Sequence, residues 1–94
     1  MEESAPQEAD IQIDYPQEGE VVGSGHYTVR ISAVDVLDVE VSIDEGPWQA
    51  CRESAGYWWF DWSGYDSGPH EMMVRGIDSE GDLIESSCEF RVDL

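Results

Sequence analysis

Aromatic rings and carboxylates are the side chains in this sequence that could do chemistry. The stretch GYWWFDWSGY, residues 56–65, holds six of the ten aromatic residues of the 94-residue chain. An aromatic face can stack on a sugar ring or engage a peptide partner, and aromatic rings also fill protein cores. Which use applies depends on the element that carries the rings.

Residues 57–62 have the composition of a β-strand, in which successive side chains alternate between two faces. We expect one face, with Trp58, Phe60 and Trp62, to enter a core. The other face then carries Tyr57 and Trp59. This alternation predicts that most of the aromatic run is structural and that two rings remain on the outside.

The outer rings, Tyr57 and Trp59, form with Trp48 the candidate ligand-binding set. An exposed Trp beside a Tyr is a common platform for a sugar ring or a peptide. Alternatively, Trp59 packs against Trp48 or against the stem of Arg52, because aromatic residues are favoured in strands for packing reasons alone.

Acidic residues raise the question of metal binding. The turn DSEGD brings Asp78, Glu80 and Asp82 together, and the segment 35–40 holds three more acids. Hard oxygen ligands suit calcium. Neither segment has the spaced Asp-x-Asp-x-Asp-Gly pattern of a calcium loop. Asp78, Glu80 and Asp82 are therefore weak calcium candidates, and the sequence predicts no metal site.

Catalytic motifs are missing from the sequence. It has no Gly-x-Ser-x-Gly, and His26 and His70 lack further metal ligands at matched spacing. A glycosidase pair of carboxylates would need a cleft, which a chain of this size does not readily build. We predict that the protein is not an enzyme and has no cofactor. His26, after Gly-Ser-Gly, is expected at the surface.

The charge balance is extreme, with 22 acidic residues against four Arg, no Lys and a formal net charge of −18. Such a chain repels nucleic acids and anionic lipids, so neither is an expected partner. The acids either attract cations or a basic partner, or keep the chain soluble at high salt, as in proteins of salt-accumulating microbes. We expect thermal melts to show higher stability in molar salt than in low salt; equal melting temperatures would contradict this.

The two cysteines, Cys51 and Cys88, leave two readings open. They are compatible with one disulfide, which an extracellular protein would favour. Cysteine also buries readily as a free thiol, so both residues could be small core side chains.

Short alternating runs separated by Gly, Pro, Asp and Ser indicate an all-β chain without helices. The acidic residues 1–9 are interpreted as a flexible linker and residues 10–94 as one domain. Seven strands are expected, near residues 11–15, 26–33, 38–44, 48–53, 57–62, 70–78 and 86–92, with a Gly of positive φ in the Asp-Glu-Gly-Pro turn. Seven short strands indicate an antiparallel sandwich.

The segments VEVSIDEGPWQA and SGPHEMMVRGIDSEGD, on either side of the Trp-rich strand, resemble bacterial immunoglobulin-like modules of the fibronectin type III kind. The pattern Val-Glu-Val-Ser-x-Asp-x-Gly-x-Trp, followed by Gly-x-His-x-x-x-Val-Arg-x-x-Asp-x-x-Gly, is also similar to the immunoglobulin-like dimerisation domain of sulfite oxidases. The resemblance covers about residues 11–93 and implies an immunoglobulin-like sandwich with His70 buried or half-buried in a strand. In the strand order that it implies, Cys51 and Cys88 are not on neighbouring strands.

The resemblance implies a non-catalytic spacer or protein-interaction module of a secreted or cell-surface protein, with a cytoplasmic location left open. An alternative is a carbohydrate-binding accessory module that uses Tyr57, Trp59 and Trp48; another is a homodimerisation domain. We expect a monomer or weak homodimer, a protein or polysaccharide partner, and no insertion into a membrane.

Overall fold

The protein is all-β in the computed structural model, which describes residues 9–94. Over these residues it has no helix, and accordingly none that is long and apolar enough to cross a membrane. The predicted linker, residues 1–9, lies outside the described residues except for Ala9. The strands are β1 (Asp10–Tyr15), β2 (Val21–Val22), β3 (His26–Val34), β4 (Val36–Ile43), β5 (Gln49–Ala50), β6 (Arg52–Ser54), β7 (Tyr57–Ser63), β8 (Gly68–Asp78) and β9 (Leu83–Val92).

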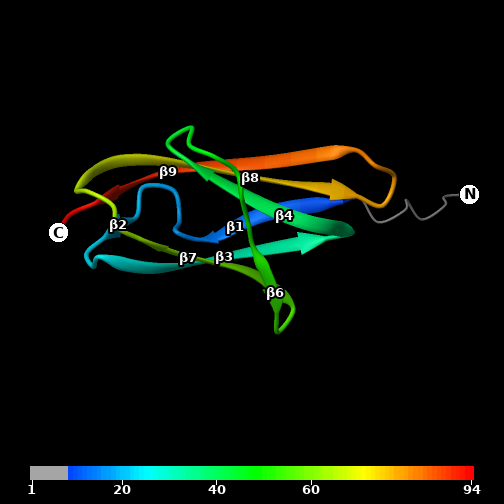
Figure 1. Cartoon of the computed structure of the whole chain (residues 1–94), viewed down its shortest axis with the longest axis horizontal. Helices are drawn as coiled ribbons and strands as arrows, with labels where there is room; N and C mark the ends of the chain where they lie inside the picture. Colours follow the sequence, from blue (N-terminus) through cyan, green and yellow to red (C-terminus); the bar gives the residue numbers. More distant parts are fainter. Residues whose placement is uncertain (1–8) are drawn as a thin grey trace, which may run out of the picture.

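Two stacked sheets form an elongated sandwich (Figure 1), in which the longest strand, β8, has 11 residues and so spans about 36 Å. One sheet has the order β1-β3-β7-β6 and the other the order β2-β9-β8-β4-β5. All pairs are antiparallel except the short parallel pair of β2 and β9. β1 begins at the end of the molecule where β8 turns into β9, and β9 finishes at the opposite end.

The predicted sandwich is confirmed, but the structure has nine strands where about seven were expected. One addition is β2, which has only two residues. The other arises because the single return strand predicted for residues 48–53 is wrong. Gln49–Ala50 pairs with β4, whereas Arg52–Ser54 pairs with β7 in the other sheet. The chain therefore changes sheets at Cys51.

Residues with positive φ allow the sharp changes of direction. Asp35, with φ 57°, lies between β3 and β4, where the chain passes from one sheet to the other. The expectation of a positive-φ Gly in the turn after β4 is wrong, because Asp44 (φ 55°) and Glu45 (φ 63°) adopt this conformation and Gly46 does not. Asp tolerates the left-handed region better than most residues. The turn also directs the Asp44 side chain toward β8.

The core lies between the sheets and follows the predicted alternation. Val29 and Ile31 of β3 and Val41 of β4 are fully buried. On β7, Trp62 is 9% exposed, and Trp58 and Phe60 pack half-buried against the core. The prediction that these three rings face inward is confirmed.

Trp62 is the centre of an aromatic cluster at one end of the core. Its ring stacks on Tyr65, with the ring centroids 3.7 Å apart. It meets His70 and Phe90 edge-to-face at 5.2 and 5.5 Å. The Tyr65 hydroxyl donates a hydrogen bond to the Ser24 carbonyl, so the cluster also ties the β2–β3 connection to β7.

Candidate functional site

The outer surface of the four-stranded sheet carries most of the predicted ligand-binding rings. Trp59 on β7 lies directly opposite Arg30 on β3 and opposite Arg52 on β6. Side chains at directly opposite positions project from the same face of a sheet. The surface, called the Trp59 face below, consists of six residues: Tyr15, Arg30, Arg52, Tyr57, Trp59 and Asp61.

Arg30 joins the rings of this face. Its guanidinium carbon lies 4.3 Å from the centre of the Tyr57 ring and 4.9 Å from that of Tyr15. Its Nε donates to Oδ2 of Asp14 at 3.1 Å. Cation–π contacts and an ion pair thus hold two tyrosines and one arginine in a fixed arrangement across three strands.

Trp59 is half-buried, and its indole has a defined orientation. The indole N–H donates to the Ser54 carbonyl at 2.8 Å, and the Tyr57 ring lies 5.9 Å away at 73°. Beside it, Arg52 Nη1 donates to Oδ2 of Asp61 at 2.9 Å. The face therefore combines a positioned indole with charged hydrogen-bonding groups.

Trp48 is not part of this face. It precedes β5, and the guanidinium carbon of Arg75 on β8 lies 4.0 Å from the centre of its ring. Arg75 also pairs with Glu40 of β4, so Trp48 covers the outer surface of the five-stranded sheet. The structure brings Tyr57 and Trp59 together but places Trp48 on the other sheet.

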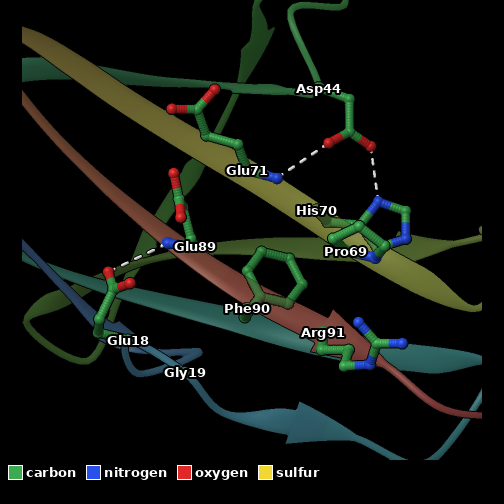
Figure 2. Close-up of a pocket in the computed structure, with 9 residues that line it drawn as sticks. All are labelled: Glu18, Gly19, Asp44, Pro69, His70, Glu71, Glu89, Phe90 and Arg91. Carbon is green, nitrogen blue, oxygen red and sulfur yellow. Dashed lines mark hydrogen bonds and ion pairs between the residues drawn. The ribbon is translucent and has the colours of Figure 1, made fainter.

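A shallow hollow of about 560 Å³ lies at a second place, on the five-stranded sheet (Figure 2). It is lined by Glu18, Gly19, Asp44, Pro69, His70, Glu71, Glu89, Phe90 and Arg91. Glu71 and Glu89 are directly opposite one another on β8 and β9. Two of the acids accept backbone or ring N–H groups: Asp44 from Glu71 and His70, and Glu18 from Glu89. The hollow is acidic and holds none of the predicted ligand-binding rings.

His70, predicted to be buried or half-buried, is 11% exposed at the edge of this hollow. Its Nδ1 lies 2.6 Å from Oδ2 of Asp44 and its Nε2 lies 2.8 Å from the Asp66 carbonyl oxygen. Both neighbours are acceptors, and only the protonated ring donates from both nitrogens. Burial lowers the pKa of His70, but the hydrogen bonds to Asp66 and Asp44 outweigh it and leave the pKa raised above 6.5. His26 is exposed, as predicted.

Stability should fall as the pH rises through the raised pKa of His70. The folded state binds this proton more tightly than the unfolded state, so the stabilisation is complete below about pH 6.5 and is lost above the folded-state pKa. We expect His70→Gln to flatten this part of the curve of unfolding free energy against pH, measured by urea denaturation. The exposed His26→Gln variant is the matched control and should retain the wild-type slope. A wild-type slope in His70→Gln would contradict the assignment.

The disulfide considered for Cys51 and Cys88 is not formed, because both thiols are free. Cys51 adjoins β5, whereas Cys88 lies on β9, with β8 and β4 between them. Three strand spacings of about 4.8 Å exceed the Cα separation of about 7 Å that a disulfide allows. Burial raises the pKa of Cys51 to about 12, with a contribution from Glu40, and that of Cys88 to about 11, so both remain protonated at neutral pH.

The weak calcium candidates do not form a site. The Asp78 carboxylate accepts the backbone N–H groups of Glu80 and Asp82 at 2.9 and 2.8 Å, which stabilises the turn between β8 and β9. Within residues 9–94 no three Asp, Glu, His or Cys side chains are grouped so that they could hold a metal ion. Asp78 therefore stabilises the hairpin turn between β8 and β9.

Sequence reasoning did not assign four residues of the Trp59 face to the candidate site: Tyr15, Arg30, Arg52 and Asp61. Arg52 was considered only as a packing partner of Trp59. The alternation in β3 and β7 already placed Arg30 and Asp61 on the face opposite the core. The missing information was the pairing of β3, β7 and β6, which aligns Arg30, Trp59 and Arg52 in one row. A period-two pattern gives the face of a residue but not its neighbour on the next strand.

Comparison with known proteins identifies the fold. No protein-family model matches the sequence, and no curated protein matches it either. Among solved structures, a modular endo-β-1,4-mannanase from Cellulomonas fimi matches 96% of this chain with a TM-score of 0.77 and 22% identity. The chain spans 20% of the length of that enzyme.

Two further structures match over most of their own length. The fibronectin(III)-like modules of Clostridium thermocellum CbhA have a TM-score of 0.66 and 17% identity, covering 90% of this chain and 95% of theirs. CopC from Methylosinus trichosporium has a TM-score of 0.67 and 19% identity, with 89% of each chain covered. The chain therefore has the immunoglobulin-like, fibronectin type III-like fold that its sequence resembled.

Proposed function

We propose that this domain is a non-catalytic accessory module that separates neighbouring domains of a secreted or cell-surface protein. The observation that carries the proposal is the path of the chain along the sandwich. β1 begins at one end of the sandwich and β9 finishes at the other (Figure 1). Domains joined to the two ends would therefore be held apart by the length of the sandwich.

The structural matches support this role. A chain of 94 residues that covers a fifth of a modular mannanase is similar to one part of a larger enzyme. The similarity to the fibronectin(III)-like modules also implies a module within a larger protein, because those modules are parts of CbhA. Secretion or display at the cell surface is included in the proposal because the sequence resembles bacterial immunoglobulin-like modules of secreted and cell-surface proteins.

Rigidity distinguishes a spacer from a flexible linker, and a distance distribution measures it. A Gly-Ser linker with the same number of residues has an r.m.s. end-to-end distance of about 50 Å with a wide spread, so the width of the distance distribution is the deciding quantity. We would place spin labels through Asp10→Cys and Asp93→Cys in a Cys51→Ala, Cys88→Ala background. Pulsed electron–electron double resonance should give one narrow distribution of distances between the two spin labels, close to the length of the sandwich.

A Gly-Ser chain of equal length, labelled at its ends, is the control and should give a broad distribution. An equally broad distribution for the folded module, or a mean well below the roughly 36 Å that β8 spans, would overturn the spacer role. Thermal unfolding of the labelled variants should first show that both label positions leave the domain folded.

A further inference from the structure

The Trp59 face places one indole between two arginines. Arg30 and Arg52 lie directly opposite Trp59 on the strands to either side of it. From this row we infer that the Trp59 face binds an uncharged oligosaccharide, with one sugar ring stacked on the indole and its hydroxyls bonded to the flanking charged groups. The inference goes beyond the spacer role and does not rest on it.

The indole is suited to stacking because its position is already fixed. Its N–H is satisfied by the Ser54 carbonyl, and its only ring neighbour in the described chain is Tyr57, which meets it at 73°. No arginine of residues 9–94 lies over it, in contrast to Tyr57 and Trp48. A ligand that stacks there would lose little free energy to ordering the side chain.

Hydrogen-bonding capacity beside the indole is only partly used. Within the described residues, Arg30 bonds through Nε to Asp14, and Arg52 through Nη1 to Asp61. A guanidinium has five N–H donors, so most of those on each arginine remain for a ligand. Asp61, which is 49% exposed, offers acceptors. A sugar hydroxyl both donates and accepts, so it can accept from an Arg52 N–H that is not bonded to Asp61 and donate to the Asp61 carboxylate.

The charge of the face favours an uncharged ligand. Two of the four arginines of the chain are here, and each is paired with one aspartate. The face is thus locally neutral on a protein with a net charge of −18. A polyanion would be repelled by the remainder of the surface, and a cation would compete with the arginines for Asp14 and Asp61.

The surroundings of the indole favour a sugar over a protein partner. The side chains next to Trp59 on the same face of β7 and directly opposite it are Tyr57, Asp61, Arg30 and Arg52, which are aromatic or charged. Among the exposed aliphatic residues, Leu37, Ile77 and Leu83 belong to β4, β8 and β9 of the other sheet, whereas Val34 lies at the end of β3. A protein contact centred on apolar packing would use that sheet, whereas an indole with charged flanks matches the apolar ring face and polar rim of a sugar.

Titration with defined oligosaccharides tests the inference. The probes are cellohexaose, mannohexaose and laminarihexaose as neutral ligands and oligogalacturonate as the anionic one, with binding followed by calorimetry at low and high salt. We expect at least one neutral hexasaccharide to bind, with an affinity that changes little with salt. Trp59→Ala should weaken that binding about tenfold or more, since each tenfold step corresponds to the loss of about one stacking contact.

Matched variants separate binding from folding. Trp48→Ala removes an indole from the other sheet and should leave the affinity unchanged. Arg52→Gln alters a side chain that is 58% exposed, so it should weaken binding while the melting temperature stays at the wild-type value. Arg52→Gln thus tests the face even if Trp59→Ala lowers stability.

Four results would overturn the inference: no neutral probe binds, only oligogalacturonate binds, Trp59→Ala binds like the wild type, or Trp48→Ala loses as much affinity as Trp59→Ala. Self-association in sedimentation velocity that Trp59→Ala abolishes, without glycan binding, would assign the face to a protein contact instead. The distance measurement between Asp10 and Asp93 is independent, so failure of one proposal leaves the other standing.

Discussion

Replacing Trp62 by alanine is expected to lower the free energy of unfolding by about 3–5 kcal/mol, the usual cost of removing a buried aromatic side chain. Trp62 is 9% exposed and contacts Tyr65, His70 and Phe90. Its loss would leave a cavity where both sheets meet, and it would remove the stacked partner of Tyr65. Since small domains are stable by about 5–15 kcal/mol, this variant should approach unfolding at 37 °C.

Urea denaturation followed by circular dichroism would measure this loss as a lower midpoint at an unchanged slope. Trp59→Ala is the matched control, because it removes the same side chain from the outer face of the same strand. We expect it to cost about 1–2 kcal/mol, from partial burial and one hydrogen bond. Equal losses in the two variants would contradict the assignment of Trp62 to the core and Trp59 to the surface.

Gly76→Ala is expected to destabilise the domain by about 1–3 kcal/mol, the range for overpacking a core. A Cβ atom on Gly76 would overlap Cγ1 of Val36 and lie 2.7 Å from the carbonyl oxygen of Asp38. The register of β4 against β8 shifts between Val36 and Asp38, and at this irregularity β4 lies very close to Gly76 of β8. A side chain at Gly76 would have to move a backbone carbonyl.

Gly23→Ala is the control for this variant, because a Cβ atom there has no neighbour within 4 Å and its φ is not in the left-handed region. It should change the free energy of unfolding by less than about 0.5 kcal/mol. Adding Val36→Ala to Gly76→Ala should recover only part of the loss, since the contact with Asp38 remains. Wild-type stability of Gly76→Ala in thermal melts would show that the strands can separate locally.

Much of the fold could be predicted because alternation reports burial directly. Val29, Ile31 and Trp62 point inward because one face of each strand must leave water. The passage between sheets at Cys51 could not be predicted, because residues 49–54 contain no Gly, Pro, Asn or Asp to mark a break between Gln49–Ala50 and Arg52–Ser54. This segment is divided only because its two halves pair with different strands, β4 and β7, and such pairing depends on contacts between residues distant in sequence.

The candidate site was predictable only in its rings. Alternation put Tyr57 and Trp59 on one face, but Trp48 was grouped with them although it lies over Arg75 on the other sheet. Trp48 and Trp59 are close in sequence, which suggested that they share a surface. The chain changes sheets at Cys51 between them, so they lie on different sheets. Strand register then placed Arg30 directly opposite Trp59, which no local pattern predicted, and placed Arg52, considered only as a packing partner, opposite it on the other side.

The parallel pairing of β2 with β9 has a mechanical consequence. Backbone bonds join the two segments from Gly19 to Glu89, from Arg91 to Glu20 and from Asp93 to Val22, at 2.8–2.9 Å. These bonds run across the strands, whereas tension applied to the two termini would act along them. A pulling force would therefore load the bonds together in shear instead of opening them one by one, so the domain resists extension best along the axis on which neighbouring domains would pull.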